Sequence, residues 1–254
     1  MIVKLATNIV AAILSIPSET IEQSVPMMAP LPSLQEFHHR TRVNDILDTG
    51  WGTWSGYDDS KMDNLDAAAA NGIDPSTYGE ITPLGARQLF HHMIITKGSR
   101  DDVVFYDLGS GTGKLIAQSY LELPRLTHAT GVELSPTRHA AALASWNTVS
   151  DRAEDIRGSD ARVTFRNGDL FHVDIRDATH IYLSSLCFTE NMMDRLGSKL
   201  LEAPGLRCVA SLKPIPGLVS KEKAKINYRE EYVQMSWNPL WGGGCRVFIY
   251  TLMD

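Results

Sequence analysis

The fold is decided by the stretch Asp107-Leu108-Gly109-Ser110-Gly111-Thr112-Gly113-Lys114. Before it, Val103–Leu108 is a short run of apolar and β-branched residues that predicts a strand, and after it the chain to about Glu122 predicts a helix. Glycines between a strand and a helix let the backbone approach a ligand closely. The stretch therefore predicts a ligand-binding turn in an α/β sheet.

The sequence on either side continues this alternation. Thr82 and Pro83 predict the start of a helix that Gly98 ends. Strands alternating with helices predict a mostly parallel sheet joined by right-handed crossovers. The predicted strands are 103–108, 127–134, 162–166, 179–184 and 206–212, the later helices are 114–122, 136–156 and 189–202, and the tail predicts an antiparallel pair at 232–234 and 246–252.

The N-terminal third differs in composition and predicts a helical extension, residues 1–77, before a main domain of residues 78–254. Ser33 and Glu36 form a capping-box pattern that predicts a helix over 33–48, which Gly50 can end. Residues 51–56 predict a loop, and 60–70 a second helix rich in alanine. The boundary follows a shift in charge as well as a change in pattern.

The glycine spacing discriminates between cofactors. A dinucleotide site requires Gly-x-Gly-x-x-Gly, whereas this loop is Gly-x-Gly-x-Gly with Asp107 two residues before its first glycine. An acid there repels pyrophosphate but suits the zwitterionic tail of an amino acid. A kinase P-loop is excluded because Lys114 is followed by Leu115 rather than by Ser or Thr. The pattern therefore favours S-adenosylmethionine over NAD.

Two further acids stand where this cofactor needs them. Glu133 lies 26 residues after Asp107, at the end of the next predicted strand, where a carboxylate can accept both hydroxyls of a ribose. Asp169, in Asn167-Gly168-Asp169-Leu170-Phe171, can accept the amino group of adenine while a neighbouring apolar side chain covers the ring. Alone, this segment is equally well explained as a tight turn with a solvated Asp. The order of all three segments favours cofactor contact.

Composition limits the classes of function. With 254 residues, 43% hydrophobic and 21% charged, the chain predicts a folded globular protein and not a disordered one. The net charge is −6, and residues 1–90 carry all of it, with five Lys/Arg against eleven Asp/Glu. Bulk electrostatics therefore predict weak intrinsic DNA affinity. The odd number of cysteines, three, indicates a reduced intracellular protein. No apolar run is long enough to predict a membrane span, and the absence of a clear cleavage pattern argues against a cleaved signal peptide.

Three further segments carry a resemblance. They are Tyr78-Gly79-Glu80, the run Ile181-Tyr182-Leu183-Ser184-Ser185-Leu186-Cys187-Phe188, and Ser211-Leu212-Lys213-Pro214 with the later Ser236-Trp237. Together with the loop they resemble the catalytic domain of the disruptor-of-telomeric-silencing (Dot-one) family, over roughly residues 75–254. These are the non-SET histone-lysine methyltransferases, which modify histone three on the nucleosome. The resemblance implies a class I methyltransferase (Rossmann-like) fold: a mostly parallel seven-stranded sheet with helices on both faces.

The resemblance also implies roles for individual residues. The catalytic set is Ser184, Phe188, Trp237 and Tyr78, with Phe188 and Trp237 lining a lysine channel and Tyr78 in the loop that covers the methionine end of the cofactor. The cofactor-binding set is Tyr78, Glu80, Asp107, Gly109, Ser110, Gly111, Gly113, Glu133, Asp169, Leu170 and Ser184. Two positions depart from the family: Ser184-Ser185 stands in place of an Asn pair, and Lys114 replaces a Gln after the loop. The serine pair offers fewer amide contacts to position the acceptor amine. The resemblance therefore does not fix the substrate or the degree of methylation.

Alternatives remain at this point. Without the resemblance, Phe188 and Trp237 are better explained as core residues. A methyltransferase for another protein or a small molecule is a second function, and a non-catalytic cofactor-binding regulatory module is a third. The histone interpretation predicts a nuclear protein, and the others a cytoplasmic one. No metal site is expected, since His38-His39 and His91-His92 are adjacent pairs that point to different helix faces.

Overall fold

The computed structural model of the chain describes residues 33–52, 79–95, 102–157, 160–219, 226–238 and 243–252. The chain divides into two units, Met1–His39 and Arg40–Asp254. The described residues of the first unit begin helix α2 (Leu34–Trp51), where the Ser33 hydroxyl accepts the N–H of Glu36 at 3.2 Å, as the capping pattern predicts. The predicted boundary between residues 77 and 78 lies outside the described residues, as does the predicted helix 60–70.

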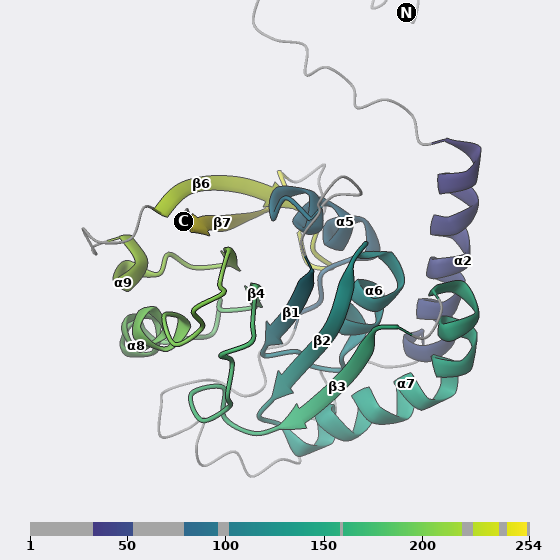
Figure 1. The fold of residues 1–254 in the computed structure, drawn as a ribbon, viewed down its shortest axis with the longest axis horizontal. Coiled ribbons are helices and arrows are strands. Elements are labelled where there is room, and N and C mark those ends of the chain that lie inside the picture. Colours follow the sequence, from purple (N-terminus) through teal and green to yellow (C-terminus); the bar gives the residue numbers. More distant parts are fainter. Residues whose placement is uncertain are drawn as a thin grey trace, which may run out of the picture. The chain divides into compact units, whose positions relative to one another are not determined.

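The second unit is built on one seven-stranded sheet in the order β3-β2-β1-β4-β5-β7-β6 (Figure 1). The first five strands in this order run parallel to one another, and β7 runs antiparallel to both β5 and β6. This arrangement confirms the predicted class I methyltransferase fold. The strands are β1 (Val103–Leu108), β2 (Leu126–Glu133), β3 (Arg162–Asn167), β4 (His180–Leu183), β5 (Cys208–Ser211), β6 (Ile226–Val233) and β7 (Cys245–Leu252).

Helices cover the two faces of the sheet unequally (Figure 1). On one face, α5 (Pro83–His92), α6 (Lys114–Glu122), α7 (Pro136–Arg157) and the second half of α2 bury one apolar cluster with the β1 residue Phe105. On the other, α8 (Glu190–Leu200) and the short α9 (Pro216–Val219) bury a second cluster that contains Leu108. The side chains of β1 alternate between these clusters because a strand has a period of two. No helix among the described residues is long and apolar enough to cross a bilayer.

The predicted stop of the first helix at Gly50 was wrong. Gly50 lies inside α2, which continues through Trp51. A Cβ at Gly50 would lie 3.2 Å from the Ser145 carbonyl oxygen and 3.2 Å from Cγ1 of Val149, so the glycine allows α2 to approach α7 closely. The apolar positions Val43, Ile46, Leu47 and Trp51 continue one buried stripe along α2 past this glycine.

Most other element boundaries fall within two residues of the prediction. Thr82 caps α5 as predicted, with its hydroxyl accepting the N–H of Gly85 at 3.0 Å. That helix ends at His92, before the predicted stop at Gly98, which lies outside the described residues. β6 begins at Ile226, six residues before its predicted start, and the single turn of α9 had no sequence prediction.

Candidate active site

The glycine loop between β1 and α6, residues 107–114, is here called the cofactor loop. Its three glycines Gly109, Gly111 and Gly113 have φ values of 98°, 54° and 79°, a region that side chains disfavour. The loop is fixed to β2, because the N–H groups of Gly109 and Ser110 both donate to the Val132 carbonyl, at 2.8 and 3.0 Å. The sequence therefore places a bare, bent backbone at the carboxyl end of the sheet.

The three glycines do not serve one purpose. A Cβ on Gly113 would overlap the ring of Phe165 and approach Cβ of Ala142 to 2.9 Å, so this glycine permits close packing of the loop on β3 and α7. A Cβ on Gly109 would meet only the ring of Phe188, at 4.0 Å. Gly109 therefore lies beside the predicted acceptor aromatic.

Glu133 lies directly against the cofactor loop. Its side chain is 7% exposed, Oε2 accepts the N–H of Gly111 at 2.8 Å, and Oε1 accepts the N–H of Ser135 at 2.9 Å. A carboxylate oxygen can accept more than one hydrogen bond. Both oxygens of Glu133 therefore keep acceptor capacity for a pair of ribose hydroxyls.

Asp107 is buried at the end of β1 and is electrostatically unbalanced. It is 3% exposed, and its Oδ1 has no hydrogen-bond partner within the described part of the chain. Burial, and after it the nearby charge of Glu133, raises the pKa of Asp107 to about 8. A buried carboxyl that lacks a partner is a candidate functional group. A cationic amino group at this point would satisfy the free oxygen.

The adenine segment is tied to Glu133. The Gly168 N–H donates to the Glu133 carbonyl at 2.9 Å, and the Asn167 amide donates to the same oxygen at 2.9 Å. Asp169 accepts the N–H of Phe171 at 2.9 Å, and Leu170 beside it is 8% exposed. The three segments predicted to bind the cofactor therefore lie together at one edge of the sheet.

Glu80 reaches the cofactor loop from a distant part of the sequence. Its Oε1 accepts the Thr112 hydroxyl at 3.2 Å, and its Oε2 lies 3.9 Å from Nζ of Lys114. Its backbone pairs with Ser236: the Ser236 N–H donates to the Glu80 carbonyl at 2.9 Å, and the Glu80 N–H donates to the Ser236 hydroxyl at 3.2 Å. Glu80 thus joins the loop to the segment that carries Trp237.

Trp237 packs on the backbone of this bridging segment. A Cβ on Gly79 would overlap the indole ring, so the glycine allows the ring to pack closely against the main chain. The Trp237 side chain remains 41% exposed. Tyr78, which precedes this glycine and was predicted to cover the cofactor, lies outside the described residues.

The two serines after β4 have different environments. Ser185 is fully buried: its hydroxyl lies 2.8 Å from that of Ser211 and accepts the Lys213 N–H at 3.0 Å. Ser184 is half-buried and shares a hydrogen bond with Tyr182, whose pKa is raised by burial and by the charge of Asp107. Only Ser184 of this pair retains exposure toward a substrate.

Phe188 is buried in the apolar core, and its backbone is fixed by a hydrogen bond. It is 7% exposed and belongs to the apolar cluster beneath α8. Nζ of Lys213 donates to its carbonyl at 2.7 Å, which fixes the turn that follows β4. One edge of the ring faces Gly109, so Phe188 combines a core position with a place beside the cofactor loop.

Comparison with known proteins now assigns the chain. The family model described as "Histone methylation protein DOT1" matches residues 67–236, which is more than half of the sequence. The chain belongs to the DOT1 histone methylation family. It is a methyltransferase of that family, and its cofactor is S-adenosylmethionine. The match covers every predicted cofactor-binding and catalytic residue except Trp237, which follows its last residue directly.

Several solved structures align with part of the chain. TrmN from Thermus thermophilus aligns at 16% identity and a TM-score of 0.48, over 68% of this chain and 49% of its own. Magnesium protoporphyrin IX methyltransferase from Synechocystis, with bound S-adenosylhomocysteine, aligns at 13% identity and a TM-score of 0.44. This alignment covers 68% of this chain and 83% of the other. A methyltransferase from Thiobacillus denitrificans aligns at 17% identity and a TM-score of 0.35, and the alignment covers 59% of this chain and 50% of the other. The DOT1-family chain thus spans about half the length of TrmN and of the Thiobacillus denitrificans protein. A comparison with curated proteins found no match.

The site residues fit S-adenosylmethionine. The unpartnered oxygen of Asp107 suits the amino group of the methionine moiety, Glu133 suits the ribose, and the bare backbone at Gly109 and Gly111 permits close approach. No group of three or more His, Cys, Asp or Glu in the described ranges is arranged to hold a metal ion. Methyl transfer from a sulfonium has no need of one.

Sequence reasoning predicted neither of two contacts beside the site of this DOT1-family chain. Nε1 of Trp51 donates to the Thr112 carbonyl at 2.7 Å inside the cofactor loop. Lys213 holds the turn of Phe188. The apolar stripe of α2 could have extended the helix to Trp51, but its partner lies 61 residues away and no sequence signal identifies it.

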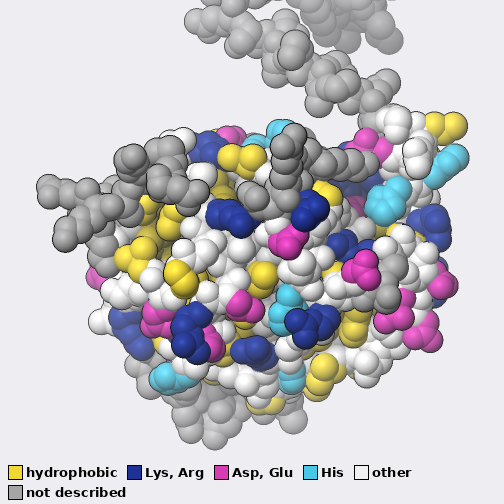
Figure 2. All heavy atoms as spheres, viewed as in Figure 1, with side chains coloured by type: hydrophobic (Ala, Val, Ile, Leu, Met, Phe, Trp, Pro, Cys, Tyr) yellow, Lys and Arg dark blue, Asp and Glu magenta, His cyan; other side chains and the backbone are white. Residues whose placement is uncertain are grey.

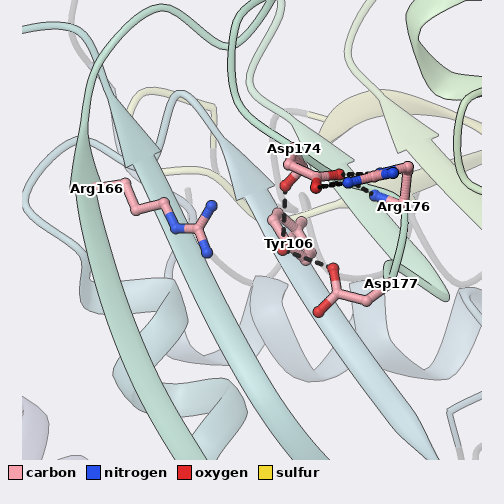
Figure 3. Close-up of a pocket in the computed structure, with 5 residues that line it drawn as sticks. All are labelled: Tyr106, Arg166, Asp174, Arg176 and Asp177. Carbon is pink, nitrogen blue, oxygen red and sulfur yellow. Dashed lines mark hydrogen bonds and ion pairs between the residues drawn. The ribbon is translucent and has the colours of Figure 1, made fainter.

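A separate cavity lies outside the cofactor site (Figure 3). It has a volume of about 390 Å³ and is lined by Tyr106, Arg166, Asp174, Arg176 and Asp177. Its two acids have local partners: the Tyr106 hydroxyl donates to Asp177 at 2.8 Å, and the Arg176 guanidinium binds both oxygens of Asp174, which holds the pKa of that carboxyl below its usual range. None of the predicted site residues lines this cavity.

Proposed function

We propose that the chain transfers the methyl group of S-adenosylmethionine to a lysine of histone three in the nucleosome. The observation that carries the proposal is the pairing of Glu80 with Ser236. This pairing brings the family's two distant segments onto the cofactor loop and places Trp237 beside them. The family match supplies the histone as the substrate class.

The proposal gives each residue a part in one displacement. Bound S-adenosylmethionine supplies an electrophilic methyl group, so the protein's contribution is alignment of the reactants and exclusion of water. Asp107, Glu133 and Asp169 bind the amino, ribose and adenine groups. The full cofactor-binding set is Tyr78, Glu80, Asp107, Gly109, Ser110, Gly111, Gly113, Glu133, Asp169, Leu170 and Ser184.

The acceptor lysine must arrive as a neutral amine. Phe188 and Trp237, here called the acceptor aromatics, form apolar surface near the cofactor loop, and an apolar channel lowers a lysine pKa by desolvation. Aromatic faces also stabilise a methylammonium product by cation–π contact. Ser184, with its hydroxyl at the end of β4, is the residue that orients the amine, and Tyr78 completes the proposed catalytic set.

The proposal includes weak DNA affinity and a nuclear location. On the face shown in Figure 2, the basic side chains of the described residues lie among acidic ones and form no continuous basic stripe. Such a stripe is the usual electrostatic footprint of a DNA-binding surface. Nucleosome recognition by this chain is therefore expected to rest on contacts with histones or on a partner. Salt-sensitive, tight binding of the isolated chain to DNA would contradict this part.

A transfer assay tests the proposal. The full chain is incubated with methyl-labelled S-adenosylmethionine and, in parallel, with nucleosomes, free histones and a cell extract, and a Gly111→Arg variant serves as the inactive control. Label on nucleosomal histone three, placed on a lysine by mass spectrometry, is the expected result. Label confined to non-histone protein or small molecules refutes the histone proposal. Cofactor binding without transfer anywhere indicates a regulatory module instead.

A further inference from the structure

Trp51, the last residue of α2, lies beneath the cofactor loop. Its side chain is 3% exposed and belongs to the apolar cluster that α2 shares with α5, α6 and α7. Its Nε1–H donates to the carbonyl of Thr112 at 2.7 Å in a fully buried hydrogen bond. We propose that Trp51 is a positioning residue of the cofactor site, which holds the loop in its ligand-binding conformation through the Thr112 carbonyl.

The loop needs such an external restraint. Thr112 stands between Gly111 and Gly113, and both glycines have positive φ. Glycine has wide conformational freedom, so its backbone does not by itself select one conformation. Glu133 fixes the N–H of Gly111, Glu80 accepts the hydroxyl of Thr112, and Trp51 fixes the carbonyl of the same residue. Each contact comes from a different element, so the loop is held from three sides before any ligand binds.

The hydrogen bond separates this role from ordinary packing. Val43, Ile46 and Leu47 bury the same stripe of α2 with apolar side chains alone. Trp146 on α7 offers a comparison in the same cluster: its ring packs edge-on against Tyr120 at 5.3 Å between ring centroids. Within the described ranges the indole N–H of Trp146 makes no hydrogen bond, whereas the Trp51 N–H donates to a main-chain carbonyl of the cofactor loop.

The assignment extends the cofactor site beyond the part of the chain that the family model matches. That match begins at residue 67, so Trp51 lies before it. Residues 40–51 belong to the same compact unit as the sheet. The end of α2 therefore contributes to preorganisation of the loop, and preorganisation raises affinity because less ordering is left to the ligand.

Calorimetric binding of S-adenosylmethionine to the full chain tests the inference, which rests on the proposed cofactor site. Trp51→Phe keeps a ring and removes the donor, and it is expected to weaken binding about tenfold, the scale of one buried hydrogen bond. Trp146→Phe removes a matched indole N–H and is expected to stay within about twofold of wild type. In turnover, the KM for the cofactor should rise while kcat at saturating cofactor holds.

Leu47→Ala separates positioning from stability. It empties a fully buried site on the same helix and should lower the melting temperature, yet leave cofactor affinity unchanged well below that temperature. If Trp51→Phe fails to fold, benzothienylalanine at position 51 keeps the ring shape and lacks the N–H. Unchanged affinity in the donor-free protein, or an equal loss in Leu47→Ala, overturns the inference. A wild-type chain that does not bind S-adenosylmethionine refutes the cofactor site itself.

Discussion

The cofactor loop and the acceptor aromatics are held in different ways. The loop is fixed mainly by contacts with Val132 and Glu133 at the end of the next strand, to which Trp51 and Glu80 add one hydrogen bond each, and its key side chains are buried. Trp237 is 41% exposed and depends on the pairing of Glu80 with Ser236, 156 residues apart. The cofactor half is therefore a buried, rigid construction built mainly on local contacts, whereas the acceptor half is exposed, depends on a long-range pairing and can vary with substrate.

Gly111→Arg is the strongest test of the rigid half. Gly111 has a φ of 54° and donates its N–H to Glu133, so an arginine both strains the backbone and fills the approach to the ribose site. We expect cofactor affinity to fall by more than about 100-fold, measured by calorimetry, since strain and exclusion act together. Gly205→Arg is the matched control, because Gly205 is exposed, lies outside the predicted site, and a Cβ there would come no closer than 4.0 Å to any described neighbour, the Ala178 carbonyl oxygen. Equal loss in both variants would refute the loop assignment.

Glu133→Gln probes the same half more gently. The substitution keeps the size of the side chain and removes the charge that accepts the N–H groups of Gly111 and Ser135. Losing charge-assisted hydrogen bonds predicts a fall in cofactor affinity of about 10- to 100-fold. Glu202→Gln, whose side chain is exposed and pairs with the buried Lys199, should bind the cofactor as wild type does. A Glu133→Gln chain of normal affinity would mean that the ribose is bound elsewhere.

Trp237→Ala tests whether the acceptor half is separable. Because Trp237 covers Gly79 and does not touch the buried loop bonds, its loss should reduce transfer about 3- to 30-fold while cofactor affinity stays within about twofold. Calorimetry measures the cofactor affinity, and a transfer assay run in parallel measures the rate of methyl transfer. Tyr232→Ala removes another exposed aromatic, from β6, and should leave both unchanged. Equal losses of binding and transfer in Trp237→Ala would show a structural role.

The same contrast explains which parts the sequence could predict. Val103–Leu108 coincides with β1 because β-branched residues and the glycines that follow are local signals. The stop at Gly50 failed because that glycine serves the approach of α7, which only the tertiary structure reveals. The Trp51 hydrogen bond spans 61 residues and leaves no local pattern.

The acceptor residues show a second limit of sequence reasoning. The resemblance grouped Ser184, Ser185 and Phe188, but it could not separate their environments. The hydrogen bonds of Ser185 with Ser211 and Lys213 link the end of β4 to the end of β5, whereas Ser184 stays half-buried. Burial is a property of the assembled sheet, so identical neighbours in sequence take different roles.

The smallest effect concerns a proton on Asp107. Its pKa is raised to about 8 in the folded chain from 3.8, so between these values the folded state holds a proton that the unfolded state has lost. The ligand-free chain therefore loses stability as pH rises through this range. A cationic amino group favours the carboxylate, so cofactor binding at pH 7 should release up to about one proton. Calorimetry in buffers of different ionisation enthalpy measures that release. It should vanish in Asp107→Asn, and a wild-type chain that releases no proton would place the amino group away from this carboxyl.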